Sequence, residues 1–338
     1  MEHQEQNIIL TSKDLETNQE VRWCPGCGDY AILKSLQKTL PELGRPKEDF
    51  VFISGIGCSS RLPYYLDTYG MHSIHGRAPA IAIGVKASNP DLSVWVITGD
   101  GDALSIGGNH LIHALRRNPD INILLFNNQI YGLTKGQYSP TSEQGKITKS
   151  SPIGTVDLPF NPLALALGAN GTFVARTLDR DPKHQQMIYK RAYHHKGASF
   201  VEIYQNCNVF NDGAFEQIIS KENKADHSIF LEHGKPLLFN NGLNGVILDG
   251  LMPKIIEVDE SNMDQLWIHD ETDSTKAYIL SRFFDSPSFP RPFGVIYVNE
   301  TKSCFDESIN TQINEHRIED KVSAFNKLLK SGNSWEVI

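Results

Sequence analysis

The chain has 338 residues, 40% of them hydrophobic and 21% charged, which is ordinary for a folded protein with a sizeable core. Asp and Glu outnumber Lys and Arg by 40 to 32, so the net charge is −8, which argues against nucleic acid or an anionic membrane as a partner. The sequence has neither an apolar leader nor a run of about 18 apolar residues, so we expect no membrane span and a cytoplasmic location.

Residues 1–22 form a polar N-terminal arm, and the region after it alternates apolar runs with helical stretches. The runs are continuously apolar, as in a parallel sheet that is covered on both faces. Strands are predicted at 50–55, 93–100, 121–128, 172–176 and 199–204. Helices are predicted at 30–40, 78–89, 103–118, 161–170 and 181–196. This pattern predicts an α/β domain over residues 23–207 with a doubly wound, mostly parallel sheet.

Beyond residue 207 the alternation breaks down. Short strands are predicted at 235–240, 245–249 and 293–298, separated by polar segments that contain proline. We therefore expect residues 208–338 to form a small C-terminal extension packed on the main domain.

Two polar residues follow neighbouring predicted strands. Asp100 ends the strand 93–100, and Asn128 ends the next strand 28 residues later. One crossover helix fits between them, so both side chains reach the same edge of the sheet. A carboxylate and an amide oxygen suit Mg²⁺ that also binds phosphate oxygens. Gly99–Gly101 followed by Asn127 and Asn128 resembles the thiamine diphosphate motif, although each half alone is an ordinary turn.

A second loop, residues 54–61, follows the first predicted strand. Gly55 and Gly57 begin a dinucleotide-binding pattern, but Ser60 stands where that pattern needs glycine, so we set a Rossmann dehydrogenase aside. The loop presents Cys58 near the expected diphosphate site. His75, which precedes another helix, is a further candidate there, with a solvated polar loop as the alternative.

The cysteines suggest a metal or cluster site. Cys24 and Cys27 form a CxxC pair, Cys58 lies on the diphosphate loop, and Cys207 follows the last predicted strand. Four cysteines from three segments suit either Zn²⁺ or a [4Fe–4S] cluster, and spacing does not decide between them. A thioredoxin-type pair fits less well, because a polar arm rather than a strand precedes it. Cys304 has no visible partner.

Context favours iron over zinc, because a cluster beside thiamine diphosphate can accept electrons and zinc cannot. Two alternatives stay open. One is a non-redox thiamine enzyme subunit with structural zinc, and the other is a catalytically silent subunit that keeps its metal sites as staples.

At this point the sequence resembles the β subunit of the 2-oxoacid:ferredoxin oxidoreductases. The matching stretches are WCPGCGDYAIL, GIGCSSR, HGRAPAIAIGVK, GDGD, NNQIYGLTKGQYSPTS and Cys207. The resemblance implies that Cys24, Cys27, Cys58 and Cys207 hold one [4Fe–4S] cluster. It implies that Asp100, Asn128 and the main-chain carbonyl of Ile130 hold Mg²⁺. It places the following residues along the thiamine diphosphate: Ile56, Gly57, Cys58, Ser59, His75, Gly101, Asp102, Gly132 and Leu133.

The resemblance also implies an activity and partners. A 2-oxoacid loses CO₂, electrons pass through the cluster to ferredoxin, and coenzyme A takes the acyl group; the reverse carboxylation uses the same site. The glutamate that activates thiamine is expected on a separate α subunit, in a heterodimer or heterotetramer, so this chain alone is expected to be inactive.

Arg61, Leu133 and Lys135 are the candidate catalytic residues. Arg61 stands where this family often has Lys, and Lys135 where many members have Gly. Either cation can meet a second substrate carboxylate, with surface solvation as the alternative. This favours 2-oxoglutarate, with pyruvate or a broad range of 2-oxoacids as the alternative.

Overall fold

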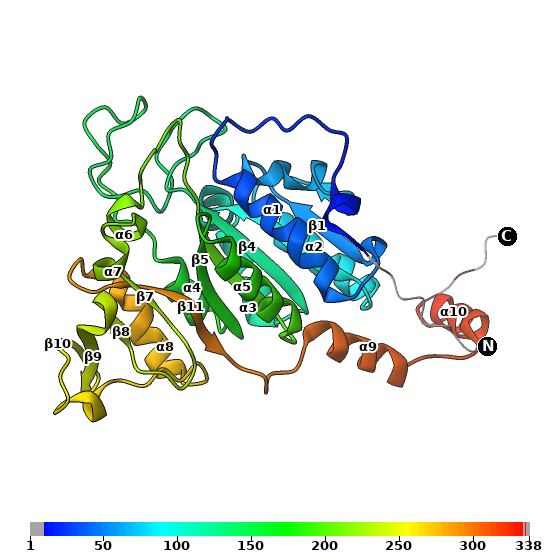
Figure 1. Cartoon of the computed structure of the whole chain (residues 1–338). Helices are drawn as coiled ribbons and strands as arrows, with labels where there is room; N and C mark the ends of the chain where they lie inside the picture. Colours follow the sequence, from blue (N-terminus) through cyan, green and yellow to red (C-terminus); the bar gives the residue numbers. More distant parts are fainter. Residues whose placement is uncertain (1–9, 334, 336–338) are drawn as a thin grey trace.

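The computed structural model describes residues 10–333 and 335, so residues 1–9 of the expected N-terminal arm lie outside the described part. An eight-stranded sheet in the order β2-β1-β3-β4-β6-β5-β11-β7 forms the centre of the molecule (Figure 1). Its strands are β1 (Phe50–Ser54), β2 (Tyr69–His72), β3 (Ser93–Gly99), β4 (Ile121–Asn127), β5 (Phe173–Leu178), β6 (Ser199–Tyr204), β7 (Ser228–Phe230) and β11 (Arg291–Val298).

Six strands of this sheet, from β2 to β5, are parallel to one another. β11 runs antiparallel to β5, and β7 pairs in parallel with β11 at the edge. The sheet is thus mostly parallel, as predicted, and the loops after β1, β3, β4 and β6 leave from one edge, which we call the carboxyl edge. The opposite edge is the amino edge.

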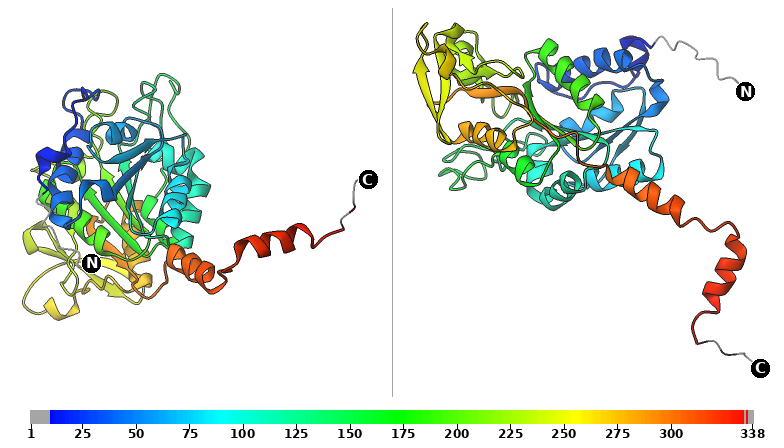
Figure 2. Two further views of the ribbon diagram at one scale, coloured as in Figure 1. Left: turned by 90° about the vertical axis from the view of Figure 1, so that its right-hand side faces the viewer. Right: turned by 90° about the horizontal axis from the view of Figure 1, so that it is seen from below.

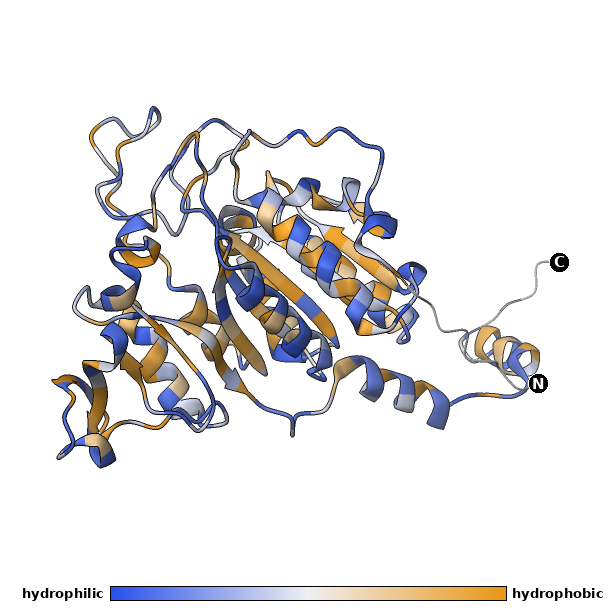
Figure 3. Ribbon diagram, viewed as in Figure 1, coloured by the Kyte–Doolittle hydropathy of each residue, from blue (hydrophilic) through white to orange (hydrophobic). Residues whose placement is uncertain are grey.

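Helices cover both faces of the sheet, because neighbouring residues of a strand point to opposite sides. Val94 and Val96 of β3 are buried with α2, α3, α4 and α8, whereas Trp95 and Ile97 are buried with α1 and α5. Figure 3 shows the resulting apolar strands. These helices are α1 (Asp29–Thr39), α2 (Ala78–Ser88), α3 (Gly108–Arg117), α4 (Pro162–Gly168), α5 (Pro182–His194) and α8 (Ser274–Ser281).

The C-terminal part is woven into this sheet. It supplies β7 and β11, and it adds a small antiparallel sheet in the order β10-β9-β8. The remaining elements are α6 (Glu216–Ile219), α7 (Lys224–His227), β8 (Leu238–Phe239), β9 (Asn244–Asp249), β10 (Met252–Glu257), α9 (Phe305–Glu315) and α10 (Lys321–Leu329). The domain boundary at residue 207 stays a prediction of the sequence, and the main sheet contains strands from both sides of it.

After β11 the chain leaves the body from the amino edge. Figure 2 shows α9 and α10 extending away from the sheet, and no residue of α10 is buried. Within the described residues, no helix is long and apolar enough to cross a membrane.

Two elements within residues 23–207 differ from the sequence-based expectation, and beyond residue 207 the strands β7 and β10 and the helices α6 to α10 were not predicted. The predicted helix 103–118 starts as a single π-helical stretch, Asp102–Ile106, and α3 begins only at Gly108. π-Helical stretches are rare and concentrate at functional sites, and this one begins at a candidate cofactor residue. The sequence pattern also gave no sign of β2, whose residues are mostly exposed at the sheet edge.

Candidate functional site

The loops at the carboxyl edge enclose a small cavity of about 70 Å³. Its lining includes all the residues that the sequence analysis assigned to the diphosphate and to Mg²⁺: Ile56, Gly57, Cys58, Ser59, His75, Asp100, Gly101, Asp102, Asn128, Ile130, Gly132 and Leu133. Three further residues line it, namely Gly99, Tyr131 and Thr134. The structure therefore brings together residues from four separate loops, which follow β1, β2, β3 and β4.

Asp100 is a buried carboxylate held in a fixed orientation. The hydroxyl groups of Ser139 and Thr141 both donate to its Oδ2 atom, each over 2.5 Å. Burial raises the pKa of Asp100 to about 6, and the two hydroxyl donors work against this rise. A bound cation would stabilise the charged form further, so the residue suits a metal ligand.

The two adjacent asparagines have different surroundings. The Asn128 side chain lines the cavity, donates to Gln205 Oε1 over 2.8 Å and accepts from the Ile130 amide over 3.2 Å. Asn127 instead turns into the sheet, where it donates to the buried Glu202 over 2.7 Å and accepts from the Gln129 amide over 3.2 Å. Asn128 is therefore the one available to a ligand.

Asp102 holds the surrounding loops in place. Its Oδ1 atom accepts from the Ile56 amide over 3.1 Å, from the Gly76 amide over 2.7 Å and from His75 Nδ1. His75 contacts Asp102 through Nδ1, so the other ring nitrogen of His75, Nε2, does not take part in this contact. A Cβ atom on Gly55 would lie 1.9 Å from Asp102 Oδ2, so the loop needs glycine there. Asp102 thus shapes the cavity mainly through protein contacts.

The four predicted cluster cysteines are all free thiols from three segments, and one of them, Cys58, lines this cavity. A Cβ atom on Gly132 would lie 3.5 Å from the sulfur atoms of both Cys58 and Cys207. Burial raises the pKa of Cys58 to about 12, and charge on Cys207 and Cys24 adds to the rise. Cys304 is buried elsewhere, at the N-cap of α9.

These thiols gather without forming a finished metal site. Among the described residues, no group of three or more His, Cys, Asp or Glu side chains is spaced to hold a metal ion. The chemistry of the donor set nevertheless fits a cluster, since all four are uncrosslinked cysteines, the ligands that iron–sulfur clusters use.

The three candidate catalytic residues are placed differently. Leu133 lines the cavity and is 42% exposed. Arg61 follows the cysteine loop, where its charge opposes the burial that raises the pKa of Cys58. Lys135 is exposed and has a left-handed backbone with φ of 75°. Arg61 and Lys135 lie outside the cavity lining.

The sequence analysis missed several supporting residues. Besides Ser139 and Thr141, these are Gln205, which holds Asn128, and Tyr131, whose hydroxyl donates to the Gly101 carbonyl over 3.1 Å. Hydroxyl and amide side chains in loops carry no spacing signal. Their only indication was that three of them belong to the stretch from Asn127 to Ser142 that carries the resemblance.

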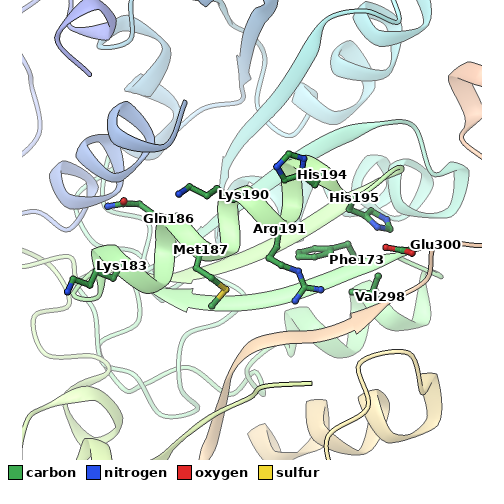
Figure 4. A pocket seen from close by; sticks show the side chains of 10 residues that line it. All are labelled: Phe173, Lys183, Gln186, Met187, Lys190, Arg191, His194, His195, Val298 and Glu300. Carbon is green, nitrogen blue, oxygen red and sulfur yellow. The ribbon is translucent and has the colours of Figure 1, made fainter. Parts of the chain in front are cut away.

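A larger cavity of about 530 Å³ lies along α5, and none of its lining residues belongs to these loops (Figure 4). Cationic side chains line it, but Lys190 pairs with Glu42, and Arg191 pairs with Glu271 over 2.8 Å. Its size exceeds that of the first cavity, but none of its lining residues belongs to the predicted diphosphate or Mg²⁺ set. We therefore assign the chemistry to the carboxyl edge.

Comparisons with known proteins agree on one group. The family of the thiamine pyrophosphate enzymes, C-terminal TPP binding domain, matches residues 55–203. The chain is 51% identical to 2-oxoglutarate oxidoreductase subunit KorB of Mycobacterium tuberculosis, over 96% of this chain and 88% of that one. It is 46% identical to 2-oxoacid:ferredoxin oxidoreductase subunit beta of Saccharolobus solfataricus, over 56% of this chain and 63% of that subunit.

The comparison of structures gives the same result. The solved 2-oxoglutarate:ferredoxin oxidoreductase from Magnetococcus marinus, with 2-oxoglutarate, coenzyme A and succinyl-CoA bound, superimposes with a TM-score of 0.77. The two chains are 32% identical, and the match covers 98% of each.

Proposed function

Because the chain belongs to the 2-oxoacid:ferredoxin oxidoreductases as a β subunit, we propose that its enzyme converts 2-oxoglutarate to succinyl-CoA and CO₂ and reduces ferredoxin. In this proposal the chain binds thiamine diphosphate, Mg²⁺ and one [4Fe–4S] cluster, and coenzyme A is the acyl acceptor. A separate α subunit completes the enzyme.

The observation that carries this proposal is the position of Cys58. It lies on the loop that lines the candidate diphosphate cavity. Its sulfur and that of Cys207 both lie next to Gly132, each 3.5 Å from where a Cβ atom on that glycine would be. With Cys24 and Cys27, these cysteines would hold the cluster next to the cofactor. This proximity suits electron transfer, which a structural zinc site would not need.

The oxygen ligands proposed for Mg²⁺ are the side chains of Asp100 and Asn128 and the carbonyl of Ile130. All three residues line the same cavity. Ser139 and Thr141 fix the orientation of the carboxylate, and Gln205 fixes that of the amide. Such supporting contacts typically change metal affinity about 10–100-fold.

Bound thiamine diphosphate would supply the carbon nucleophile and the electron-accepting ring that decarboxylation needs. The residues of this chain would bind and orient its diphosphate, and Asp102 would keep His75 turned toward it through Nδ1. The cavity of about 70 Å³ is well below the roughly 300–1,000 Å³ of ordinary ligand pockets, so we infer that much of the cofactor lies against the α subunit.

The preference for 2-oxoglutarate rests on Arg61 and on the names of the relatives. Arg61 is only partly exposed and lies beside the cysteine loop, where its guanidinium can hold a second carboxylate by two hydrogen bonds. Pyruvate has no such group. Changing Arg61 to Gln is therefore expected to raise KM for 2-oxoglutarate about tenfold or more and to leave KM for pyruvate within about twofold.

The decisive experiment purifies the chain with its α subunit under anaerobic conditions. Iron, sulfide and zinc are measured, and the visible spectrum is recorded before and after 2-oxoglutarate and coenzyme A are added. About four iron and four sulfide per chain, with absorption that bleaches on addition, are expected. Bleaching with pyruvate alone would overturn the substrate, and about one zinc per chain without colour would overturn the redox function.

Two cysteine variants sharpen this test. Cys58→Ser is expected to reduce the iron content strongly, because it removes a proposed ligand beside the cofactor loop. Cys304→Ser is the matched control, since Cys304 is buried at the start of α9 and should leave the iron content unchanged. Equal iron contents in the two variants would contradict the ligand assignment.

A further inference from the structure

A long segment between β4 and α4 carries large apolar side chains into solvent. Within residues 143–160, which we call the docking hairpin, Ile147 is 69% exposed, Ile153 97%, Val156 84% and Leu158 75%. In Figure 1 the segment stands away from the body, and Figure 3 shows apolar residues spread along it. Four such residues in one short segment exceed the scattered apolar exposure of an ordinary surface.

Backbone hydrogen bonds hold the docking hairpin in a defined conformation. The Phe160 amide donates to the Pro140 carbonyl over 2.8 Å and closes its base. Further out, Gly145 and Thr155 are joined by a 2.8 Å backbone hydrogen bond, and Thr148 pairs with Ser151. The backbone groups are thus used within the hairpin, while its apolar side chains remain free to contact something else.

The base of the docking hairpin is tied to the proposed metal ligands. Ser139 and Thr141, which donate to Asp100, directly precede it in the chain. At its near end, Lys146 contacts the side chain of Asn211. Asn211 in turn donates to the Asn128 carbonyl over 2.9 Å. A partner that fixed the hairpin would therefore also fix both ligands.

We propose that the docking hairpin is the surface on which the α subunit seats, and that this seating orders Asp100 and Asn128 for Mg²⁺ and the cofactor. The inference rests on the proposed function, because it names the partner of that site. The α subunit is the occupant because the hairpin follows residues 128–134, most of which line a cavity too small for the cofactor, and that subunit must complete the cavity.

Assembly is tested with the double variant Ile153→Ser, Val156→Ser in the complex of full-length chain and α subunit. Both side chains point into solvent, so folding should be unaffected, as far-UV circular dichroism and thermal unfolding would verify. Sedimentation velocity over a dilution series gives the dissociation constant between the subunits. It is expected to rise about 100-fold, since loss of each buried anchor weakens binding about tenfold or more.

The matched control is Leu251→Ser, Met252→Ser, which removes two apolar residues that are each 67% exposed at the turn between β9 and β10. It should change the dissociation constant less than twofold. If the double variant does not reassemble at all, Val156→Ser alone should raise the constant about tenfold. Equal dissociation constants for the hairpin variants and the control would overturn the proposal. So would a hairpin variant that alters only association between copies of this chain.

The proposed coupling has its own measurement. Lys146→Met removes the link to Asn211 and leaves the apolar surface intact, so subunit affinity should stay within about twofold. The dissociation constant for thiamine diphosphate with Mg²⁺, measured on the complex by tryptophan fluorescence, should rise about tenfold. No change in it would overturn the coupling. Neither readout uses turnover, so a zinc-containing or pyruvate-specific enzyme would refute the proposed function without changing these results.

Discussion

The two edges of the central sheet use buried polar residues in different ways. At the carboxyl edge, Asp100 and Asn128 are oriented by neighbours and still face a cavity. At the amino edge, polar side chains bind one another and the backbone. Asn118 is fully buried at the end of α3, where its amide oxygen accepts from Thr172 over 2.6 Å and from the Ala198 amide over 2.8 Å.

The amino edge thus joins distant segments. The Asn118 amide group also donates to the carbonyls of Lys302 and Ser303, over 3.3 and 3.2 Å, and so anchors the chain just before α9. Buried polar groups that are satisfied by protein add stability and order. Those aimed at a cavity leave part of their capacity for a ligand. Whether a buried polar side chain is fully hydrogen-bonded to protein or partly open to a cavity therefore distinguishes residues that stabilise the fold from residues that can bind a ligand.

The largest expected effect is a difference in activity between variants of two aspartates, one at each edge of the sheet. Asp100→Asn should lower kcat of the assembled enzyme about 10³-fold or more, because it removes the proposed Mg²⁺ ligand and such a ligand contributes several kcal/mol to catalysis. Its unfolding temperature should hardly fall, because the change removes a buried charge. Asp120→Asn is the control, since Asp120 pairs with Lys86 over 2.9 Å at the amino edge and should affect stability only. Similar activities in both variants would erase the distinction.

The next effect concerns stability alone. Asn118→Ala should lower the free energy of unfolding by about 4 kcal/mol. It leaves buried hydrogen-bonding groups without a partner, and it places alanine at a φ of 60°. Asn118→Gly keeps the backbone favourable and should lose roughly 1 kcal/mol less. Urea unfolding measures both. Cofactor affinity should be unchanged, and a tenfold loss of it would show that the edges are coupled.

The amino edge should also respond to acid through His195. The Thr172 hydroxyl proton goes to Asn118, so His195 Nε2 donates to Thr172 over 2.8 Å, and burial lowers the pKa of His195 to about 4. Below pH 6.5 the unfolded chain binds a proton that the folded chain does not, so stability falls as the pH drops from 6.5 to 4. At pH 4.5 this amounts to roughly 2–3 kcal/mol at 1.36 kcal/mol per pKa unit. His195→Gln should remove that part of the difference in urea unfolding between pH 7 and 4.5, and an unchanged difference would contradict the assignment.

The smallest effect tests the backbone at the carboxyl edge. Lys135 adopts φ of 75°, so Lys135→Gly should raise the free energy of unfolding by about 1 kcal/mol. If its ammonium group does not hold substrate, KM for 2-oxoglutarate should change less than twofold. A tenfold rise in KM would instead assign the second substrate carboxylate to Lys135. Lys235→Gly is a control at an exposed lysine outside the cavity lining and outside the docking hairpin.

Much of the fold was predictable because its central strands are buried on both faces. β3, β4 and β6 read as continuous apolar runs, and their structural bounds lie within two residues of the predicted ones. Edge strands lack this signal: Tyr69 and Met71 of β2 are exposed. The apolar run 293–298 predicted a strand, but such a run contains no information on direction, and β11 turned out to be antiparallel to β5.

At the site, residues in recognisable motifs were easier to find than the residues that support them. Asp100 and Asn128 follow strands at a telling spacing, so their meeting at one edge could be foreseen. Ser139 and Thr141 come from a loop whose path no periodicity describes. Asp102 was expected beside the cofactor, whereas its contacts with Thr98, Ile56 and Gly76 depend on how three loops pack.

The insertion of β11 beside β5 has a consequence for biosynthesis. β5 must wait for residues 291–298 to leave the ribosome before its outer side is paired, although its other neighbour, β6, is complete by Tyr204. During that interval β5, an apolar strand, has unpaired backbone N–H and C=O groups along one side, and these can pair with strands of other nascent chains. Release of the chain before β11 would therefore yield an aggregation-prone product, and early capture by a chaperone would protect it.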